Sequence, residues 1–303
     1  MIVVFGSLNM DLVFRVEALP SPGETRLCPG YDSAVGGKGA NQAAAAARAG
    51  GDCRMVGCIG ADGFGDRVAR ELAACGVDID GVARVGRPTG CAAVIVDANG
   101  ENQIAVASGA NLEARAEAVA DDWLRAASTL LLQLEVPAEE NWRLLQRARE
   151  RGLRVVLNAA PAATIPAKVA RHIDVLVVNE HEARTLLQDD AADDAANARA
   201  LAATTGGACI VTRGGAGALA AHPDGMLDIG ALPVDVVDST GAGDAFVGAL
   251  AAALDAGQKL APALRQASVA GALACTLPGA LPSLPTRRAI LAALDRLPPA
   301  RSL

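Results

Sequence analysis

The chain has 303 residues, of which 51% are hydrophobic, 20% are charged and 2% are aromatic. This apolar fraction predicts a large buried core in one domain spanning residues 1–303, and it excludes a disordered chain. The formal net charge of −7 and the scarcity of aromatic rings speak against nucleic-acid binding, which needs a basic face or platforms for base stacking.

The N-terminal residues, the lengths of the apolar stretches and the cysteine pattern together indicate a cytoplasmic protein. Residues 1–5 are apolar but lack a basic region, so they predict a first strand rather than a signal peptide. No apolar stretch reaches membrane-spanning length without glycine, proline or charge, so we expect no membrane association. The seven cysteines are scattered without a C-x-x-C pair, which is typical of free thiols in a reducing compartment.

The order of the predicted elements favours an α/β fold. Short apolar runs predict strands at 1–5, 54–59, 130–134, 154–157, 175–178 and 209–212. Helical spacing predicts helices between them, first in the alanine-rich run that residues 36–42 open and that extends to 49, and then at 64–75, 139–151, 182–187 and 195–204. Further helices are predicted at 244–256, 262–275 and 287–294. Uninterrupted apolar strands between amphipathic helices imply a three-layer α/β/α domain with a mostly parallel central sheet.

Two segments, at about 12–35 and 89–108, fall outside this alternation. Asn99-Gly100 lies between the apolar runs 91–96 and 102–107, which indicates a β-hairpin. We expect the two segments to form a small β-sheet over the carboxyl ends of the main strands. Open α/β sheets bind ligands at that edge, and a lid there would exclude water from a reaction.

The segment Asp238–Phe246, with the sequence D-S-T-G-A-G-D-A-F, carries the strongest chemical signal. Gly241, Ala242 and Gly243 place backbone N–H groups before an apolar helix, where the partial positive charge of the helix can hold a phosphoryl group. Asp244 at the same helix start can accept a proton from an attacking hydroxyl. These residues alone are equally compatible with simple capping of the helix.

A second glycine-rich segment, G-G-K-G-A-N-Q at 36–42, opens the alanine-rich helix. Its glycines let the backbone approach a ligand, and Lys38 and Asn41 offer hydrogen bonds to sugar hydroxyls. It is not a phosphate-binding Walker A loop, because glycine follows the lysine. A tight turn with close helix packing also explains the glycines.

Polar side chains follow several of the predicted strands. Asn9 and Asp11 come after the first strand, and Glu135 comes after another, so they can face one cleft, although Glu135 is equally placed to cap the next helix. The Asn-x-x-Glu pair Asn179 and Glu182 can hold Mg²⁺ through water or form a helix cap. The glycine cluster that follows Thr212 can border a nucleotide phosphate or ribose, but glycine clusters alone are not specific.

Taken together and in this order, these segments resemble the ribokinase-like family of carbohydrate kinases, the phosphofructokinase-B type, from Gly6 to Pro285. Residues 36–43 are similar to the N-terminal signature of the family, and residues 238–248 are similar to its C-terminal signature. The resemblance implies an ATP-dependent phosphotransferase with an alcohol group as acceptor. Because Asn9, Asp11 and Asn41 give a polar pocket, a free sugar is favoured, and ribose first among sugars.

The resemblance also implies roles residue by residue. Asp244 would be the catalytic base, and Gly241, Ala242 and Gly243 would form the anion hole. With Asp244, the sugar ligands would be Asn9, Asp11, Gly37, Lys38, Asn41 and Glu135. The ATP ligands would be Asn179, Thr212, Gly214, Gly217, Gly243 and Ser268, where Ser268 replaces an Asn or His that is usual in similar enzymes. Glu182 would help to place Mg²⁺. An activating K⁺ would be held by Asp238, Thr240, Ala274, Leu277, Gly279 and Ser283, largely through backbone carbonyls.

In similar enzymes the lid also forms the dimer contact, so we expect a homodimer through the segments 12–35 and 89–108. Two other functions stay open. The first is a kinase of the same family for fructose, a sugar acid or a nucleoside, although a nucleoside would favour more aromatic walls. The second is a sugar-binding module without catalysis, against which the retention of Asp244 and the Gly-Ala-Gly sequence argues. The absence of a G-x-G-x-x-G after the first strand disfavours a dinucleotide-dependent oxidoreductase.

Overall fold

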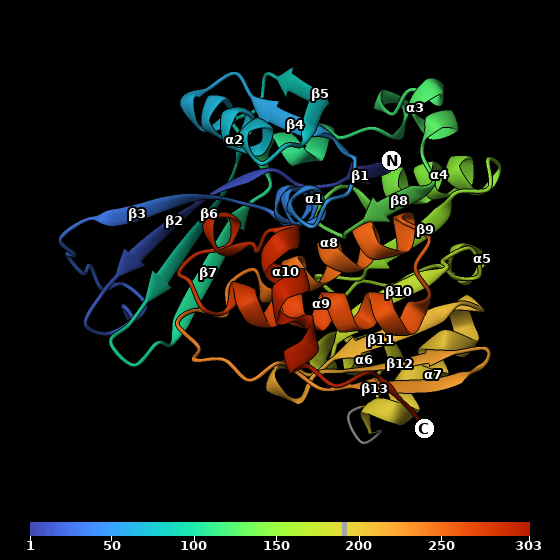
Figure 1. Ribbon diagram of the computed structural model, residues 1–303. Helices are drawn as coiled ribbons and strands as arrows, with labels where there is room; N and C mark the ends of the chain where they lie inside the picture. Colours follow the sequence, from blue (N-terminus) through green and yellow to red (C-terminus); the bar gives the residue numbers. More distant parts are fainter. Residues whose placement is uncertain (190–192) are drawn as a thin grey trace.

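A central sheet of ten strands organises the computed structural model, which describes residues 1–189 and 193–303 (Figure 1). In spatial order its strands are β14 (Arg301–Ser302), β13 (Gly225–Ile229), β12 (Ala218–His222), β11 (Ala208–Thr212), β10 (Val175–Asn179), β9 (Arg154–Asn158), β8 (Thr129–Leu132), β1 (Ile2–Phe5), β4 (Cys53–Gly60) and β5 (Asp78–Val85). Neighbours from β11 to β5 are parallel, and β12, β13 and β14 are antiparallel additions. The predicted mostly parallel sheet is confirmed.

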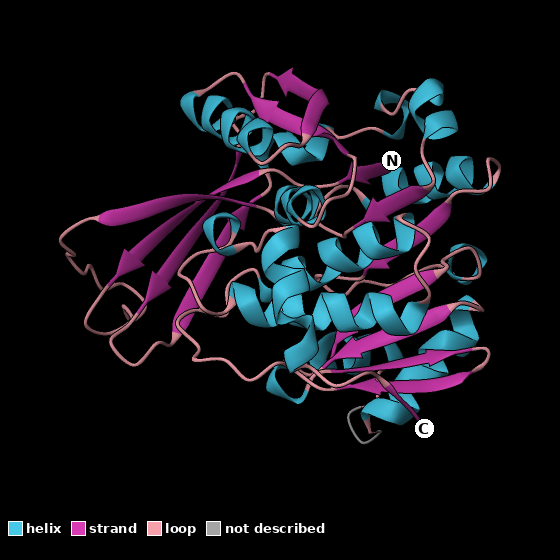
Figure 2. Cartoon of the chain, viewed as in Figure 1, coloured by secondary structure: helices cyan, strands magenta, loops and turns pink. Residues whose placement is uncertain are grey.

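Helices cover both faces of this sheet (Figure 2). They are α1 (Lys38–Arg48), α2 (Gly63–Ala74), α3 (Asp121–Ala126), α4 (Ala138–Arg149), α5 (Ala167–Ala170), α6 (Glu180–Leu187), α7 (Asp194–Thr205), α8 (Ala242–Asp255), α9 (Leu260–Ala274) and α10 (Arg287–Ala293). Short 3-10 helices lie at η1 (Gly109–Glu113), η2 (Ala116–Ala118), η3 (Gly214–Ala216), η4 (Leu281–Ser283) and η5 (Leu294–Arg296). Within the described ranges, none of the helices is long and apolar enough to cross a membrane.

The strand β1 explains why two cores form. Ile2 and Val4 pack in one hydrophobic cluster with buried residues of α1, α8 and α9, whereas Val3 and Phe5 pack in a second cluster with residues of α4 and α7. Successive side chains of a strand point to opposite faces, so a strand that is apolar at every position must be covered on both sides. The three-layer α/β/α prediction is therefore confirmed.

A separate four-stranded sheet projects from the main body on the left of Figure 1. Its order is β3 (Tyr31–Gly36), β2 (Asn9–Arg15), β6 (Gly90–Val96) and β7 (Asn102–Ala107), with β2 and β6 parallel and the outer pairs antiparallel. We call it the small sheet. The predicted hairpin at Asn99-Gly100 joins β6 to β7. Since β2 begins four residues after β1 ends, the small sheet starts at the carboxyl edge of the main sheet.

The chain order reverses beside β1, which has β4 on one side and β8 on the other. Phe5 pairs with Leu132 at the carboxyl ends of β1 and β8. In open α/β sheets, a reversal of this kind leaves a crevice at the carboxyl edge, because the flanking connections diverge to opposite faces. The residues that follow Phe5 and Leu132 are therefore placed to meet in this crevice.

Close contact between α1 and α8 brings their N-terminal turns to the same crevice. A Cβ added to Gly248 of α8 would lie 2.5 Å from the Cβ of Ala45 and 2.6 Å from the backbone oxygen of Gln42, so only glycine fits there. The alanine-rich sequence of α1 provides the other small surface. This approach is what allows side chains of α1 to reach the start of α8.

Candidate active site

The first turn of α8 presents free backbone N–H groups at the crevice. Gly241, the N-cap, has φ of 76°, a left-handed conformation that favours glycine, and an added Cβ would lie 2.9 Å from the Cα of Ala280. The N–H of Ala242 donates to Ser239 O at 3.2 Å, whereas the N–H groups of Gly241 and Gly243 have no acceptor among the described residues. The start of α8 can therefore bind an anion mainly through Gly241 and Gly243.

The carboxylate of Asp244 is half-buried beside these N–H groups and receives two amide hydrogen bonds. Asn41 Nδ2 donates to its Oδ2 at 3.0 Å, and Gln42 Nε2 donates to its Oδ1 at 2.8 Å. Burial raises the pKa of Asp244, and the charge of Lys38 with the two amide donors offsets only part of this, so the pKa stays above its usual value. A carboxylate with a raised pKa is suited to accept a proton during a reaction.

Glu135 occupies the N-terminus of α1. Its Oε2 accepts hydrogen bonds from Ser7 Oγ at 2.5 Å and from the backbone N–H of Lys38 at 2.9 Å. Ser7 Oγ in turn accepts from the N–H of Gly39 at 3.2 Å. A negative charge is favourable at a helix N-terminus, and Oε1 of Glu135 remains available for a ligand. The cap on the next helix, α4, is instead Pro137, so Glu135 does not cap that helix.

Asp11 and Asn9 reach the crevice from β2 of the small sheet. Burial first, and then the nearby charges of Glu135 and Asp244, raise the pKa of Asp11 to about 6. The Asp11 carboxylate lies over Gly36, where an added Cβ would be 2.1 Å from Oδ2. Asn9 Oδ1 accepts from Asn111 Nδ2 at 2.7 Å, which leaves the Asn9 amide nitrogen to donate.

The positive charge of Lys38 offsets the negative charges of the nearby carboxylates. Burial lowers its pKa, but the charges of Asp244, Glu135 and Glu182 outweigh that effect and raise the pKa above its usual value. The lysine is therefore cationic at neutral pH, in a partly buried place where its charge is poorly screened. A cation beside free N–H groups and a raised-pKa carboxylate can stabilise charge that develops on a transferred phosphoryl group.

A hollow of about 150 Å³ lies at the carboxyl ends of the strands, and Lys38 and Asp244 line it. The other predicted sugar ligands do not line it; they are Asn9, Asp11, Gly37, Asn41 and Glu135. Seven of the site residues predicted from the sequence line this hollow, namely Lys38, Asn179, Glu182, Thr212, Gly241, Gly243 and Asp244. Asn158, Ala160, Val177, Val178 and Val247 complete the lining. Asn158 ends β9, and its place as a polar residue after an apolar run is the signal that could have assigned it to the site.

Asn179 and Glu182 form a capping box at the start of α6. Asn179 Oδ1 accepts from the N–H of Glu182 at 2.7 Å, and Glu182 Oε2 accepts from the N–H of Asn179 at 2.8 Å. Burial raises the pKa of Glu182, against the opposing effects of the Asn179 N–H and of Lys38. Glu182 also lines the hollow, and its other carboxylate oxygen is not part of the box. This oxygen fits Mg²⁺, which retains several waters and uses few carboxylates. In the described ranges no cluster of three His, Cys, Asp or Glu could hold a metal by itself.

Apart from Asn179 and Gly243, the residues predicted for the nucleotide lie at the end of β11, after β11 and on α9. Thr212 Oγ1 donates to Val178 O at 3.3 Å, and Gly217 turns back so that its carbonyl accepts from the N–H of Arg213 at 2.7 Å. A Cβ on Gly217 would lie 2.0 Å from Ile229 O. Ser268 is buried and donates to Gly230 O at 2.7 Å, so its hydroxyl is engaged. Gly214, Gly217 and Ser268 do not line the hollow.

Asp238 joins the loop before α8 to the loop after α9. Its Oδ1 accepts from Thr240 N at 2.9 Å and from Thr240 Oγ1 at 2.7 Å, and its Oδ2 accepts from Gly279 N at 2.8 Å. Ser283 is buried, with its hydroxyl donating to Ala280 O, whereas the side chain of Leu277 is 52% exposed. Carboxylate and carbonyl oxygens of these loops, which include Ala274 at the end of α9, are ligands of the kind that a hard cation takes.

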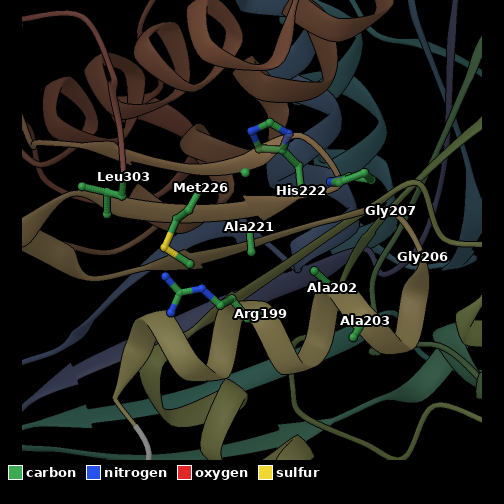
Figure 3. A pocket seen from close by; sticks show the side chains of 11 residues that line it. Arg199, Ala202, Ala203, Gly206, Gly207, Ala221, His222, Met226 and Leu303 are labelled. Carbon is green, nitrogen blue, oxygen red and sulfur yellow. The ribbon is translucent and has the colours of Figure 1, made fainter.

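A larger hollow of about 470 Å³ lies elsewhere, between α7 and the β12–β13 hairpin (Figure 3). Arg199, His222, Met226 and Leu303 are among its lining residues, and none of the residues that line it is an Asp or Glu. Gly207, at its rim, precedes β11, whereas Thr212 ends β11, so the two hollows lie at opposite edges of the sheet. We assign the reaction chemistry to the smaller hollow because the acid–base and anion-binding groups gather there.

Comparison with known proteins identifies the family of the chain. Residues 1–287 match the model of the pfkB family carbohydrate kinases. A ribokinase of Schizosaccharomyces pombe is 36% identical over 302 residues, covering 94% of this chain and 95% of that protein. A bifunctional ribokinase/ribose-5-phosphate isomerase A of Fructilactobacillus sanfranciscensis is also 36% identical, and this chain spans 56% of its length. The structure of an Arabidopsis thaliana ribokinase complexed with ribose and ATP aligns with a TM-score of 0.90 at 34% identity, covering 97% of this chain and 98% of that one. The match over nearly the whole length, together with the shared fold, shows that the chain belongs to the pfkB family of carbohydrate kinases.

Proposed function

We propose that the protein is a ribokinase, which transfers the γ-phosphoryl group of ATP to the 5-hydroxyl of D-ribose. The observation that carries the proposal is the half-buried, raised-pKa carboxylate of Asp244, set beside the free N–H groups of Gly241 and Gly243 and the charge of Lys38. This arrangement supplies a base and an anion site within one hollow. The relatives named ribokinase, one of them complexed with ribose and ATP, support the choice of substrates.

The sugar binds in the crevice between the small sheet and α1. Carboxylates accept hydrogen bonds from hydroxyls, and amide groups both donate and accept, so a polyhydroxy ligand is matched by this set. The sugar-binding residues are Asn9, Asp11, Gly37, Lys38, Asn41 and Glu135. The scarcity of aromatic side chains in the chain favours a free sugar over a nucleoside.

Asp244 removes the proton of the 5-hydroxyl as its oxygen attacks the γ-phosphorus, and ADP leaves from the opposite side. Gly241 and Gly243, with the helix N-terminus that includes Ala242, hold the equatorial oxygens of the transferred group. Lys38 contributes positive charge at the same place. The phosphoryl group therefore meets fixed donors rather than water.

ATP lies along the carboxyl edge of β10 and β11, against Asn179, Thr212, Gly214, Gly217, Gly243 and Ser268. Glu182 helps to hold Mg²⁺ through water, and the ion, when bound, neutralises charge on the phosphate oxygens. Asp238 and Thr240, with the loop that contains Ala274, Leu277, Gly279 and Ser283, hold an activating K⁺ largely through carbonyl oxygens. Because Gly241 packs on Ala280, an ordered cation loop would also order the anion site.

The segments 12–35 and 89–108 act as a lid on a single kinase domain, and the lid forms a homodimer contact in the cytoplasm. The side chains of Ile104 and Val106, which share one face of the small sheet, are 57% and 56% exposed, an apolar surface that a second copy would cover. Val106→Asp is expected to convert a dimer to a monomer in light scattering coupled to size exclusion. A monomeric wild-type protein at micromolar concentration would contradict this part.

The substrate proposal is tested by following ADP release with Mg-ATP and a panel of D-ribose, 2-deoxyribose, fructose, sugar acids and nucleosides, with Na⁺ or K⁺ as the monovalent ion. We expect turnover highest on D-ribose and increased by K⁺. Higher kcat/KM on another acceptor would retain the chemistry and reject ribose. Ribose or ATP binding without turnover on any acceptor would instead support a sugar-binding module and overturn the kinase proposal.

A further inference from the structure

Gln42 is fully buried in α1, and every polar atom of its amide is engaged. Nε2 donates to Asp244 Oδ1 at 2.8 Å and to Asn158 Oδ1 at 2.9 Å, and Oε1 accepts from Gln133 Nε2 at 2.8 Å. An amide nitrogen carries two hydrogens, so both are used. An ionised carboxylate only accepts, so the nitrogen of Gln42 must face Asp244, and this fixes the orientation of the whole amide.

The two amide partners of Gln42, Asn158 and Gln133, are themselves buried. Asn158 Nδ2 donates to Val177 O at 3.1 Å, and the backbone oxygen of Gln133 accepts from Asn141 Nδ2 at 2.7 Å. The side-chain oxygen of Gln133 packs on Gly6, where an added Cβ would lie 2.0 Å from it. A row of buried amides therefore runs from Gln133, just after β8, through Gln42, to one oxygen of Asp244. In a low-dielectric interior such hydrogen bonds are strong and hold their members rigidly.

We propose that Gln42 is a positioning residue for phosphoryl transfer, which fixes the Asp244 carboxylate from the core side without touching sugar or nucleotide. The inference rests on the proposed kinase function. Gln42 is 0% exposed and does not line the hollow, whereas Asp244 does. With Oδ1 held by Gln42, the second oxygen, Oδ2, is left on the side of Asn41, the predicted sugar ligand.

Loss of the Gln42 donor should alter catalysis in a characteristic way. The charged groups that act on Asp244 are Lys38 of α1, Glu135 after β8, Asp11 of β2 and Glu182 of α6, and the two amide donors add to the effect of Lys38. Without the Gln42 donor, the pKa of Asp244 rises further and its carboxylate can rotate. We expect kcat to fall about 10- to 100-fold, because a hydrogen bond to a charged group is lost. The KM for ribose should change little.

The test compares three variants of the full chain. Gln42→Met removes the amide and keeps the length of the side chain. Gln42→Glu keeps the shape but sets a second carboxyl group against Asp244. Gln146→Met, on the exposed side of α4, is the matched control. For each we would measure kcat and KM for ribose and ATP from pH 5 to 9, with the midpoint of thermal unfolding.

The expected result for Gln42→Met is the loss in kcat, a KM for ribose within about 3-fold of wild type, and an acid limb of the kcat profile moved to higher pH. Gln42→Glu should lose more at neutral pH and recover as the pH rises, because two adjacent carboxyl groups retain a shared proton. A folded Gln42→Met variant with wild-type kcat and an unmoved acid limb would overturn the proposal. If Gln42→Met does not fold, a wild-type pH profile for Gln42→Glu has the same meaning. An inactive wild-type protein would overturn the kinase function itself. The comparison with wild type therefore separates failure of the kinase proposal from failure of the Gln42 proposal.

Discussion

Ser7 donates its hydroxyl hydrogen to Glu135 Oε2 at 2.5 Å, although 128 residues separate them in the chain. Ser7 follows β1 and Glu135 follows β8, and these strands are neighbours because the strand order reverses there. The same carboxylate oxygen accepts the backbone N–H of Lys38, so one contact joins β1, β8 and α1. The proposed sugar crevice is thus built from the ends of elements that only the topology of the sheet brings together.

Removal of this hydroxyl should weaken sugar binding. In Ser7→Ala, Glu135 loses one of its two donors, and we expect the KM for ribose to rise about 5- to 15-fold, which corresponds to about 1–1.5 kcal/mol for one hydrogen bond. Isothermal titration with ribose and initial-rate kinetics measure the change. Ser21→Ala, in an exposed turn, is the control. An unchanged ribose affinity would mean that Glu135 is held well enough by α1 alone.

Asp244→Asn should remove the proposed base and retain the shape of the site. We expect kcat to fall by about 10²–10⁴, the usual contribution of general base catalysis, with the dissociation constants of ribose and ATP within a few-fold of wild type. Asp224→Asn is a suitable control, because Asp224 lies in the β12–β13 turn with a side chain that is 95% exposed. A variant that retains more than a tenth of the wild-type kcat would show that another group takes the proton.

Ribose binding should weaken in acid because of Asp11. Its pKa is raised to about 6, so in the free protein the side chain becomes neutral as the pH falls below 6 and accepts hydrogen bonds less strongly. The dissociation constant of ribose should therefore increase between pH 7 and pH 5. Calorimetry over this range, with Asp11→Asn for comparison, measures the effect. The variant should bind more weakly at neutral pH and show a flatter dependence on pH.

The same raised pKa predicts a stability change of defined sign. The native protein holds the Asp11 proton more tightly than an unfolded chain, for which the pKa is 3.8. This favourable contribution is complete below pH 3.8 and is lost as the pH rises through about 6. Asp11→Asn, which cannot ionise, should therefore unfold at a higher temperature than wild type at pH 7.5, and the difference should shrink toward pH 4. Thermal unfolding without ligand would refute this if the order of the two proteins were reversed.

Gly36→Ala should act through Asp11 rather than through the fold. The new methyl group would meet the end of the Asp11 side chain, which must rotate away, whereas a Cβ on Gly30 of the preceding loop would meet nothing within 4 Å. We expect about a 10-fold or larger increase in the KM for ribose and little change in thermal stability, since only a flexible side chain moves. Gly30→Ala should match wild type in both measurements. A large loss of stability in Gly36→Ala would indicate instead that β3 itself shifts.

The fold could be predicted from the sequence wherever strands are buried on both faces. Val3, Val4 and their equivalents give uninterrupted apolar runs that no exposed segment would carry. Several strands were not predicted individually. Tyr31–Gly36 and Asp78–Val85 lie at sheet edges and carry exposed or half-buried polar residues, so their hydrophobic pattern is weak. The predicted strand 130–134 ends at Leu132, because the side chain of Gln133 turns into the buried amide row.

The candidate site was predictable where the chemistry is local. Residues 36–42 and 238–244 are recognisable because glycines, a helix start and a carboxylate stand next to one another. Gln42 lies within the first of these segments, and Ser7 and Asn158 stand at the ends of predicted strands, which marks a position at the site but not a role. Each acts through a partner more than 90 residues away, as Gln42 does with Gln133. A glutamine within a run of alanines is the one local sign that this position serves a particular contact.

Gly248 packs closely against Ala45, and this contact divides the proposed substrate-binding groups into two sets. One set moves with helices α1 and α8, and the other moves with the small sheet. Because no side chain separates α1 from α8, these helices are expected to move as one body, and Asn41, Gln42 and Asp244 travel together with them. Asp11 belongs to the small sheet and is tied to Asp244 only through charge. Any movement of the small sheet relative to these helices therefore changes the distance from Asp11 to Asp244. The hydrogen bonds that Asn41 and Gln42 donate to Asp244 are unaffected by such a movement. Opening would release the sugar by withdrawing one wall, so product can depart without dismantling the groups that the next turnover needs.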